Sequence, residues 1–126
     1  MVPKPQIEAF RHLEHLVVAV YEATDGMPRG CDPEVVRRLR TAATSAGDSY
    51  LDGCSTDGVV PCRHRWNQSL VLLEEVANLV DVADDAGFLD RETVLSLLEV
   101  QSAAVVRLLI LLDELPGTEP VLLKAA

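Results

Sequence analysis

The three histidines of this chain have the side chains best suited to proton transfer or metal binding. His12 and His15 stand three residues apart, a spacing that places both on one face of a helix, whereas His64 lies in a different segment. A di-iron site inside a helical bundle requires Glu-x-x-His pairs, and this pattern does not occur in the sequence. We therefore expect no metal, no other cofactor and no catalytic residue. A metal or hydrolytic enzyme that uses these histidines is kept as the least favoured alternative.

The three cysteines, Cys31, Cys54 and Cys62, lack the Cys-x-x-Cys spacing of zinc and redox sites. An odd number of cysteines in a chain without a recognisable secretory signal predicts free thiols. Cys54 and Cys62 flank one loop, and a disulfide between them is the alternative. Cys62 and His64 are two residues apart on a predicted helix, where their side chains diverge, so we do not expect a Cys-His nucleophile.

Five arginines form two groups that could contact an acidic partner. A guanidinium group binds phosphate or carboxylate oxygens through a planar set of donors. The candidate residues for binding a nucleic acid or a protein partner are Arg37, Arg38 and Arg40, followed later by Arg63 and Arg65. The alternative is a solvated surface on which these arginines pair with neighbouring acids such as Glu34.

The net charge of the chain is −9, and it is distributed unevenly. Residues 71–126 hold 11 acidic and three basic residues, whereas residues 1–70 hold nine acidic and eight basic residues. An acidic chain repels nucleic acid at long range, although a local basic patch repeated in an oligomer could still hold a polyanion. Residues 71–126 are expected to form either a solvated acidic surface or a binding surface for a basic partner.

The elements that must position these residues are helices. The chain has 126 residues, of which 48% are hydrophobic and only 4% aromatic, so we expect one domain over residues 1–126 with an aliphatic core. Apolar residues recur at three- and four-residue steps between turn signals, which predicts an all-α fold. Short connections favour an antiparallel up-down-up-down four-helix bundle. The predicted helices span residues 5–24, 33–52, 61–86 and 91–115, and the tail 116–126 is expected to be frayed.

The second predicted helix has clear signals at both ends. Asp32 is a favourable N-cap, and Pro33 suits the first helical position. Gly53 is expected to be the C-terminal glycine, and Pro61 to open the next helix. Small residues in the middle of the helix, including Gly47, predict a close approach by a neighbouring helix or a kink.

The last predicted helix contains the most apolar stretch, AAVVRLLILL at residues 103–112. Ten residues are too few to span a bilayer, and the N-terminus lacks the apolar core of a signal peptide, so we expect a cytoplasmic protein without a membrane or small-molecule partner. Val105, Leu108 and Leu112 are expected to face the bundle, whereas Ala104 and Leu111 find no cover within one chain. The predicted core and subunit-interface residues are Ala104, Val105, Leu108, Leu109, Leu111 and Leu112. Arg107, the polar residue of the stretch, should reach its rim or pair with an acid across the interface.

Residues 39–53, LRTAATSAGDSYLDG, resemble a helix signature of the four-helix-bundle proteins encoded in rRNA intervening sequences, R-R-A-A-x-S-I-x-x-N-I-A-E-G. Ser49 stands at the Asn position of that pattern. Residues 10–14 resemble the family's opening F-x-x-L-x-V, and residues 70–75 with 86–89 resemble its S-L-x-E-L … L-G-Y-L. The matching positions in the signature are Arg40, Ala42, Ala43, Ser45, Asp52 and Gly53.

That family includes the accessory variability determinant of diversity-generating retroelements. The resemblance implies a non-enzymatic adaptor that forms a barrel-like homo-oligomer, most often a homopentamer, and that binds a reverse transcriptase, its template RNA, or both. By this analogy the arginines of the second helix contact the partner or the nucleic acid. The alternative is a structural or protein-interaction four-helix bundle with no nucleic-acid role.

Overall fold

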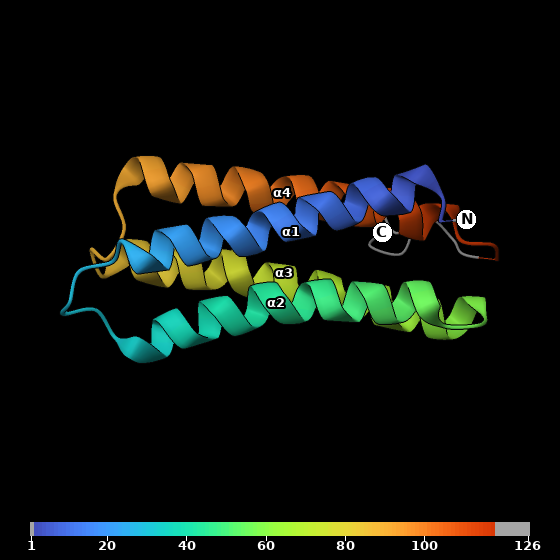
Figure 1. Cartoon of the computed structure of the whole chain (residues 1–126), viewed down its shortest axis with the longest axis horizontal. Coiled ribbons are helices and arrows are strands. Elements are labelled where there is room, and N and C mark those ends of the chain that lie inside the picture. The colour runs from blue at the N-terminus through green and yellow to red at the C-terminus, as the bar shows by residue number, and fades with distance from the viewer. Residues whose placement is uncertain (1, 118–126) are drawn as a thin grey trace, which may run out of the picture.

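The computed structural model describes residues 2–117, and this part of the chain contains four α-helices and no strands. The all-α four-helix fold predicted from the sequence is therefore confirmed for these residues. The connections α1–α2 and α3–α4 lie at one end of the molecule, and the connection α2–α3 lies at the other (Figure 1). Residues 118–126 of the predicted frayed tail lie outside the described residues. The helices are α1 (Lys4–Asp25), α2 (Pro33–Ser55), α3 (Val59–Asp85) and α4 (Arg91–Glu114).

Side-chain caps fix the starts of two helices, and one of them, Asp32, is the N-cap that the sequence predicts. The Asp32 carboxylate accepts a hydrogen bond from the backbone N–H of Glu34 at 2.9 Å, and Pro33 occupies the first helical position. At the start of α4, the Asp90 carboxylate accepts from the backbone N–H of Thr93 at 2.8 Å. This hydrogen bond lowers the pKa of Asp90, because it stabilises the charged carboxylate.

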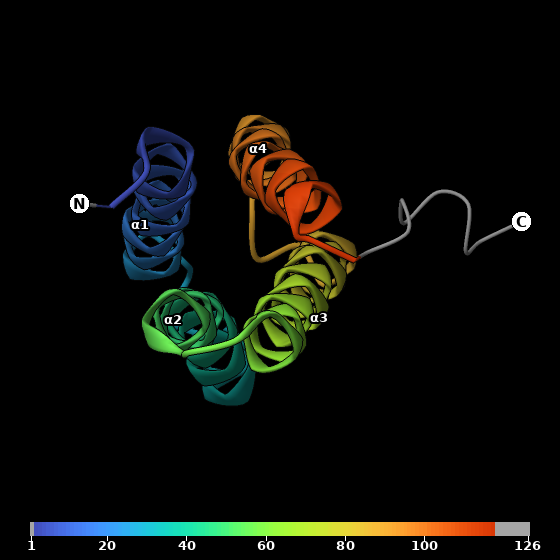
Figure 2. The same ribbon diagram turned by 90° about the vertical axis from the view of Figure 1, so that its right-hand side faces the viewer.

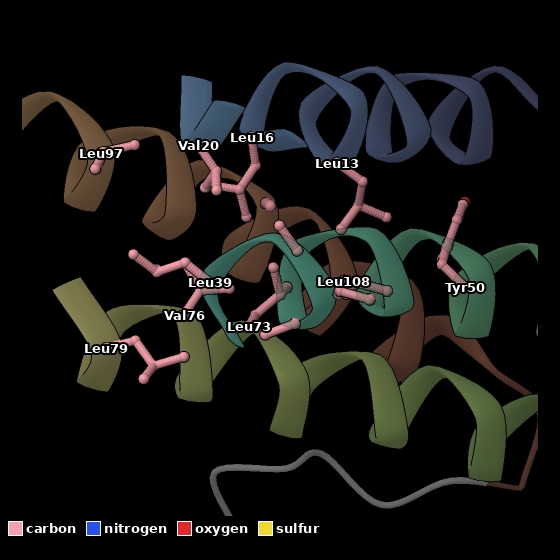
Figure 3. Packing of buried hydrophobic residues seen from close by; sticks show 14 of the residues in the cluster. Leu13, Leu16, Val20, Leu39, Tyr50, Leu73, Val76, Leu79, Leu97 and Leu108 are labelled. Atoms are coloured by element: carbon pink, nitrogen blue, oxygen red, sulfur yellow. The ribbon is translucent and has the colours of Figure 1, made fainter. Parts of the chain in front are cut away.

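The core lies between all four helices and consists mainly of leucine, valine and alanine (Figure 3). Leu13 of α1, Leu39 of α2, Leu73 of α3 and Leu108 of α4 are each 1% exposed or less. Fully burying one such leucine stabilises the fold by about 1.5–3 kcal/mol. The core therefore depends on one apolar face from each helix, as the spacing of apolar residues indicates.

The seam between α2 and α3 also carries buried polar contacts. The Trp66 Nε1–H donates to the carbonyl of Tyr50 at 3.2 Å, and the Ser69 hydroxyl donates to the carbonyl of Ala46 at 2.7 Å. The rings of Tyr50 and Trp66 are stacked with their centroids 5.6 Å apart. These contacts hold the two helices together because each buried donor is satisfied by the neighbouring helix.

Gly53 has a different role from the predicted one. Helix α2 continues beyond it to Ser55, so the expectation that Gly53 ends the helix is wrong. A Cβ atom at this position would lie 2.5 Å from Cδ1 and 2.6 Å from Nε1 of Trp66. Glycine is required here because the indole ring of α3 occupies the space of a side chain.

The start of α3 also differs from the prediction. The helix begins at Val59, two residues before Pro61. Proline is compatible with the first turn because the first backbone N–H groups have no partner within the helix. Gly58 precedes the helix with a φ of +102°, a backbone conformation that favours glycine.

Candidate interaction surfaces

The first group of candidate arginines lies on α2, where Arg37 and Arg38 are paired with acids. Arg37 forms an ion pair with Glu34 one turn earlier on the same helix, and this contact lowers the pKa of Glu34. Arg38 reaches across to α3 and contacts Glu75 at 3.0 Å. Both pairs are exposed, so solvent and salt screen them and they add little to the stability of the fold. They match the solvated, acid-paired surface that the sequence left open as the alternative.

Arg40 joins α2 to the C-terminal end of α1. Its guanidinium group donates to the Thr24 hydroxyl at 2.8 Å and to the Asp25 carboxylate at 2.7 Å. The same group lies 4.5 Å from the centre of the Tyr21 ring, a cation–π distance. Three contacts to one neighbouring helix give Arg40 a structural role in the bundle.

The second group of arginines lies at the other end of the molecule, at the start of α3. Arg65 donates to the side chain of Gln68 at 3.2 Å, and Arg63 donates to the carbonyl of Pro116 at 3.5 Å. The start of α2 and the start of α3 lie at opposite ends of the bundle (Figure 1). The structure therefore does not bring the two arginine groups together into one basic patch within a single chain.

None of the three histidines belongs to a group of side chains that could bind a metal ion within residues 2–117. His15 is exposed, His12 is half-buried, and His64 lies 3.3 Å from the Gln68 amide on α3. Within residues 2–117, no three histidine, cysteine, aspartate or glutamate side chains lie close enough to hold a metal ion. The arrangement offers no metal centre among the described residues.

The three cysteines are free thiols in this structure. Burial raises the pKa of Cys62, which lies in the first turn of α3, and the neighbouring Cys54 raises it further. Burial also raises the pKa of Tyr50, whose phenol donates to the carbonyl of Gln6 at 2.7 Å. These shifts keep the thiol and the phenol protonated, so neither is prepared to act as a nucleophile.

Most of the apolar residues predicted at a subunit interface lie inside the core of a single chain. Ala104, Leu108, Leu111 and Leu112 are all buried, with at most 6% exposed. The expectation that Ala104 and Leu111 find no cover within one chain is wrong, because they complete the stripe of α4 that packs on the other helices. Val105 and Leu109, also predicted there, are half-buried.

Arg107 finds its partner within the chain. Its Nη1 lies 3.5 Å from the Glu8 carboxylate of α1, and both side chains are partly exposed. The sequence could not specify this pairing because the two residues lie on the first and last helices. Arg107 therefore links α4 to α1 at the surface.

A second apolar stripe on α4 is exposed, and Leu109 is the one of its residues that the sequence predicted at an interface. Leu95, Val106 and Ile110 are 52%, 53% and 44% exposed. Half-buried Leu98 and Leu109 continue the same stripe at three- and four-residue steps. The signal is in the sequence, since α4 carries two interleaved sets of apolar residues, but periodicity alone does not say which set faces the core.

Helix α4 is long and apolar enough to cross a membrane, judged by length and composition alone. Its most apolar 18-residue window has a mean hydropathy of 1.9, and 33% of that window is buried in the bundle. The sequence predicted no membrane-spanning helix because the uninterrupted apolar run is too short. Glu99 and Arg107 interrupt that run, but they lower the mean hydropathy of the helix only slightly. Much of the apolar surface of α4 is therefore not used by the core of this chain.

Comparisons with known proteins add no family to this description. No protein-family model and no curated protein matches the chain. The surfaces of the bundle are therefore the basis for inferring its function.

Proposed function

We propose that this chain is a non-enzymatic adaptor that assembles into a barrel-like homo-oligomer of antiparallel four-helix bundles. The proposal follows the resemblance to the accessory proteins of diversity-generating retroelements. In that role the assembly, most simply a homopentamer, binds a reverse transcriptase and supports its action on template RNA. The compartment proposed for this activity is the cytoplasm.

The observation that carries the proposal is the exposed apolar stripe on α4. Leu95, Val106 and Ile110 each leave about half of their surface in water, in a helix whose opposite face is buried. Leaving this stripe in water is unfavourable by about 25 cal/mol per Å² of apolar surface. Exposed apolar surface on a soluble domain commonly marks a protein interface, and subunit assembly would remove this stripe from water.

The charges favour a protein as the partner over direct contact with RNA. Arg37, Arg38 and Arg40 already form ion pairs with acids of the same chain. A net charge of −9 adds long-range repulsion against phosphate and attraction toward a basic protein. A reverse transcriptase that itself binds nucleic acid would provide such a basic surface.

A protein-interaction bundle with no nucleic-acid role is the second candidate. The same ion pairs support it, because they leave few free cations on α2. The two candidates share self-assembly and differ in the partner.

Two measurements test the proposal. Light scattering on a sizing column should give a mass several times that of one 13.7 kDa chain, and a strict monomer would refute the adaptor. Co-expression with the reverse transcriptase of a diversity-generating retroelement should give a stable complex. This complex separates the candidates, because a bundle without a nucleic-acid role would not bind the reverse transcriptase. RNA titrated at several salt concentrations checks for direct contact with RNA, because phosphate contacts give a steep salt dependence.

A further inference from the structure

A long groove follows the seam between α1 and α2. It consists of three adjoining hollows of about 490, 260 and 350 Å³. Thr44 borders the first and second hollows, and Phe10 and Leu51 border the second and third, so the three form one continuous depression. The groove extends from the N-terminal turns of α2 to its C-terminal turns.

The floor of the groove is open at Gly47. A Cβ atom at this position would meet no atom within 4 Å, whereas the same atom at Gly53 would collide with Trp66. The sequence predicted a close approach of a neighbouring helix or a kink at Gly47, and no helix of this chain comes close to that position. A glycine in the middle of a helix is unfavourable by about 1 kcal/mol relative to alanine, so its use here suits a site where another backbone comes close.

The walls of the groove are mainly apolar and partly exposed, although Glu14, Arg37, Arg40 and Asp48 also border it. Ile7 and Val18 of α1 are 40% and 53% exposed, and Leu51 of α2 is 42% exposed. Amphipathic helices bind in grooves of this kind through residues spaced three and four apart. The occupant that the surface fits is therefore a helix with an apolar stripe about as long as α1.

Helix α4 of a second copy has the required stripe. Leu95, Leu98, Val106 and Ile110 share one face of this 24-residue helix, against 22 residues in α1, and exposed Glu99 and Ser102 lie on the same face. Leu95, Val106 and Ile110 are exposed, and Leu98 is half-buried at the edge of the core. The stripe and the groove therefore match in length, and both are mainly apolar.

The two surfaces lie on different sides of one molecule. In the end-on view, α1 and α2 form one side of the bundle, and α3 and α4 form the other (Figure 2). One chain therefore cannot place its own α4 stripe in its own groove, but a neighbouring copy can. A contact between two different surfaces of identical chains is heterologous, and it closes into a ring when the rotation between subunits allows it.

We propose that the exposed stripe of α4 of one copy docks into the α1–α2 groove of the next copy. This inference rests on the proposed self-assembly and names the two surfaces that produce it. Each subunit then donates one stripe and accepts another, and both apolar surfaces leave water. Gly47 is the position where the incoming helix comes closest to α2.

Two variants test the two surfaces separately. Gly47→Leu fills the floor of the groove, and Ile110→Glu places a charge on the stripe. Each should raise the protein concentration needed for assembly by about thirtyfold or more, the effect of losing a central interface contact. Val71→Glu is the matched control, because Val71 is 65% exposed on α3 and belongs to neither surface. Thermal unfolding should show that Gly47→Leu remains at least as stable as the parent chain.

Mixing the two disrupted variants gives the decisive measurement. The Gly47→Leu chain keeps its stripe and the Ile110→Glu chain keeps its groove, so an equal mixture should form a complex of one copy of each, with the mass of a dimer. Folded variants that do not combine would overturn the heterologous contact. Assembly of Gly47→Leu like the parent, or equal disruption by Val71→Glu, would also overturn it while leaving self-assembly intact. A monomeric parent chain would instead refute the proposed function itself.

Discussion

Two glycines on α2 should respond with opposite signs to the same substitution. At Gly53, an alanine Cβ would lie 2.5 Å from the Trp66 ring and 3.2 Å from Cβ of Arg65. Trp66 has little freedom to move, since it is 2% exposed, stacks on Tyr50 and donates its N–H to the Tyr50 carbonyl. At Gly47, an alanine Cβ would meet no atom within 4 Å.

The magnitudes follow from three opposing effects. Overpacking at Gly53 costs about 1–3 kcal/mol, and displacement of Trp66 weakens a buried hydrogen bond that contributes about 1 kcal/mol. Replacing glycine by alanine inside a helix raises the free energy of unfolding by about 1 kcal/mol. We therefore expect Gly53→Ala to lower the free energy of unfolding by about 1–3 kcal/mol, and Gly47→Ala to raise it by about 1 kcal/mol. At about 4 °C per kcal/mol for a domain of this size, the Tm values move by about −4 to −12 °C and +4 °C.

Thermal and urea unfolding monitored by circular dichroism would measure both changes. Trp66 is the only tryptophan of the chain, so its fluorescence reports directly on the contact with Gly53. Both substitutions should be made in the Ile110→Glu chain, so that self-assembly does not contribute to the measured stability. If Gly53→Ala is as stable as the parent, the close approach of Trp66 to α2 does not constrain this position and the reasoning is refuted.

Three further predictions concern other parts of the bundle. Arg40→Met should lower the free energy of unfolding by about 1 kcal/mol, because it removes the contacts to α1, and thermal unfolding in 1 M salt should show a smaller difference because the exposed pair with Asp25 is screened. Since burial raises its pKa, Cys62 should be alkylated more slowly at pH 8 in the native protein than in urea; equal rates by mass spectrometry would contradict its burial. Leu109→Asp should abolish assembly, because an interface does not accept an unpaired carboxylate, and a folded variant with the parent's oligomeric mass would exclude that residue from the interface.

The sequence alone determined that the chain forms helices and where two of them begin. Apolar residues at three- and four-residue steps identify α-helices because side chains at these steps share one face. Asp32 and Asp90 mark helix starts because their carboxylates satisfy backbone N–H groups that the helix leaves without partners. These are local effects, so they are readable from the order of residues.

The tertiary structure decided which residues are used for packing and which remain available. Gly53 is typical of a helix end in sequence, but the Trp66 ring from another helix gives it its role. In the sequence Arg40 is a candidate binding residue, but in the structure it forms an ion pair with Asp25 of α1. On α4, two apolar stripes are equally periodic, and only the positions of the other helices determine that Leu108 is buried and Ile110 exposed. Each of these outcomes depends on contacts between residues far apart in sequence, and local spacing does not specify such contacts.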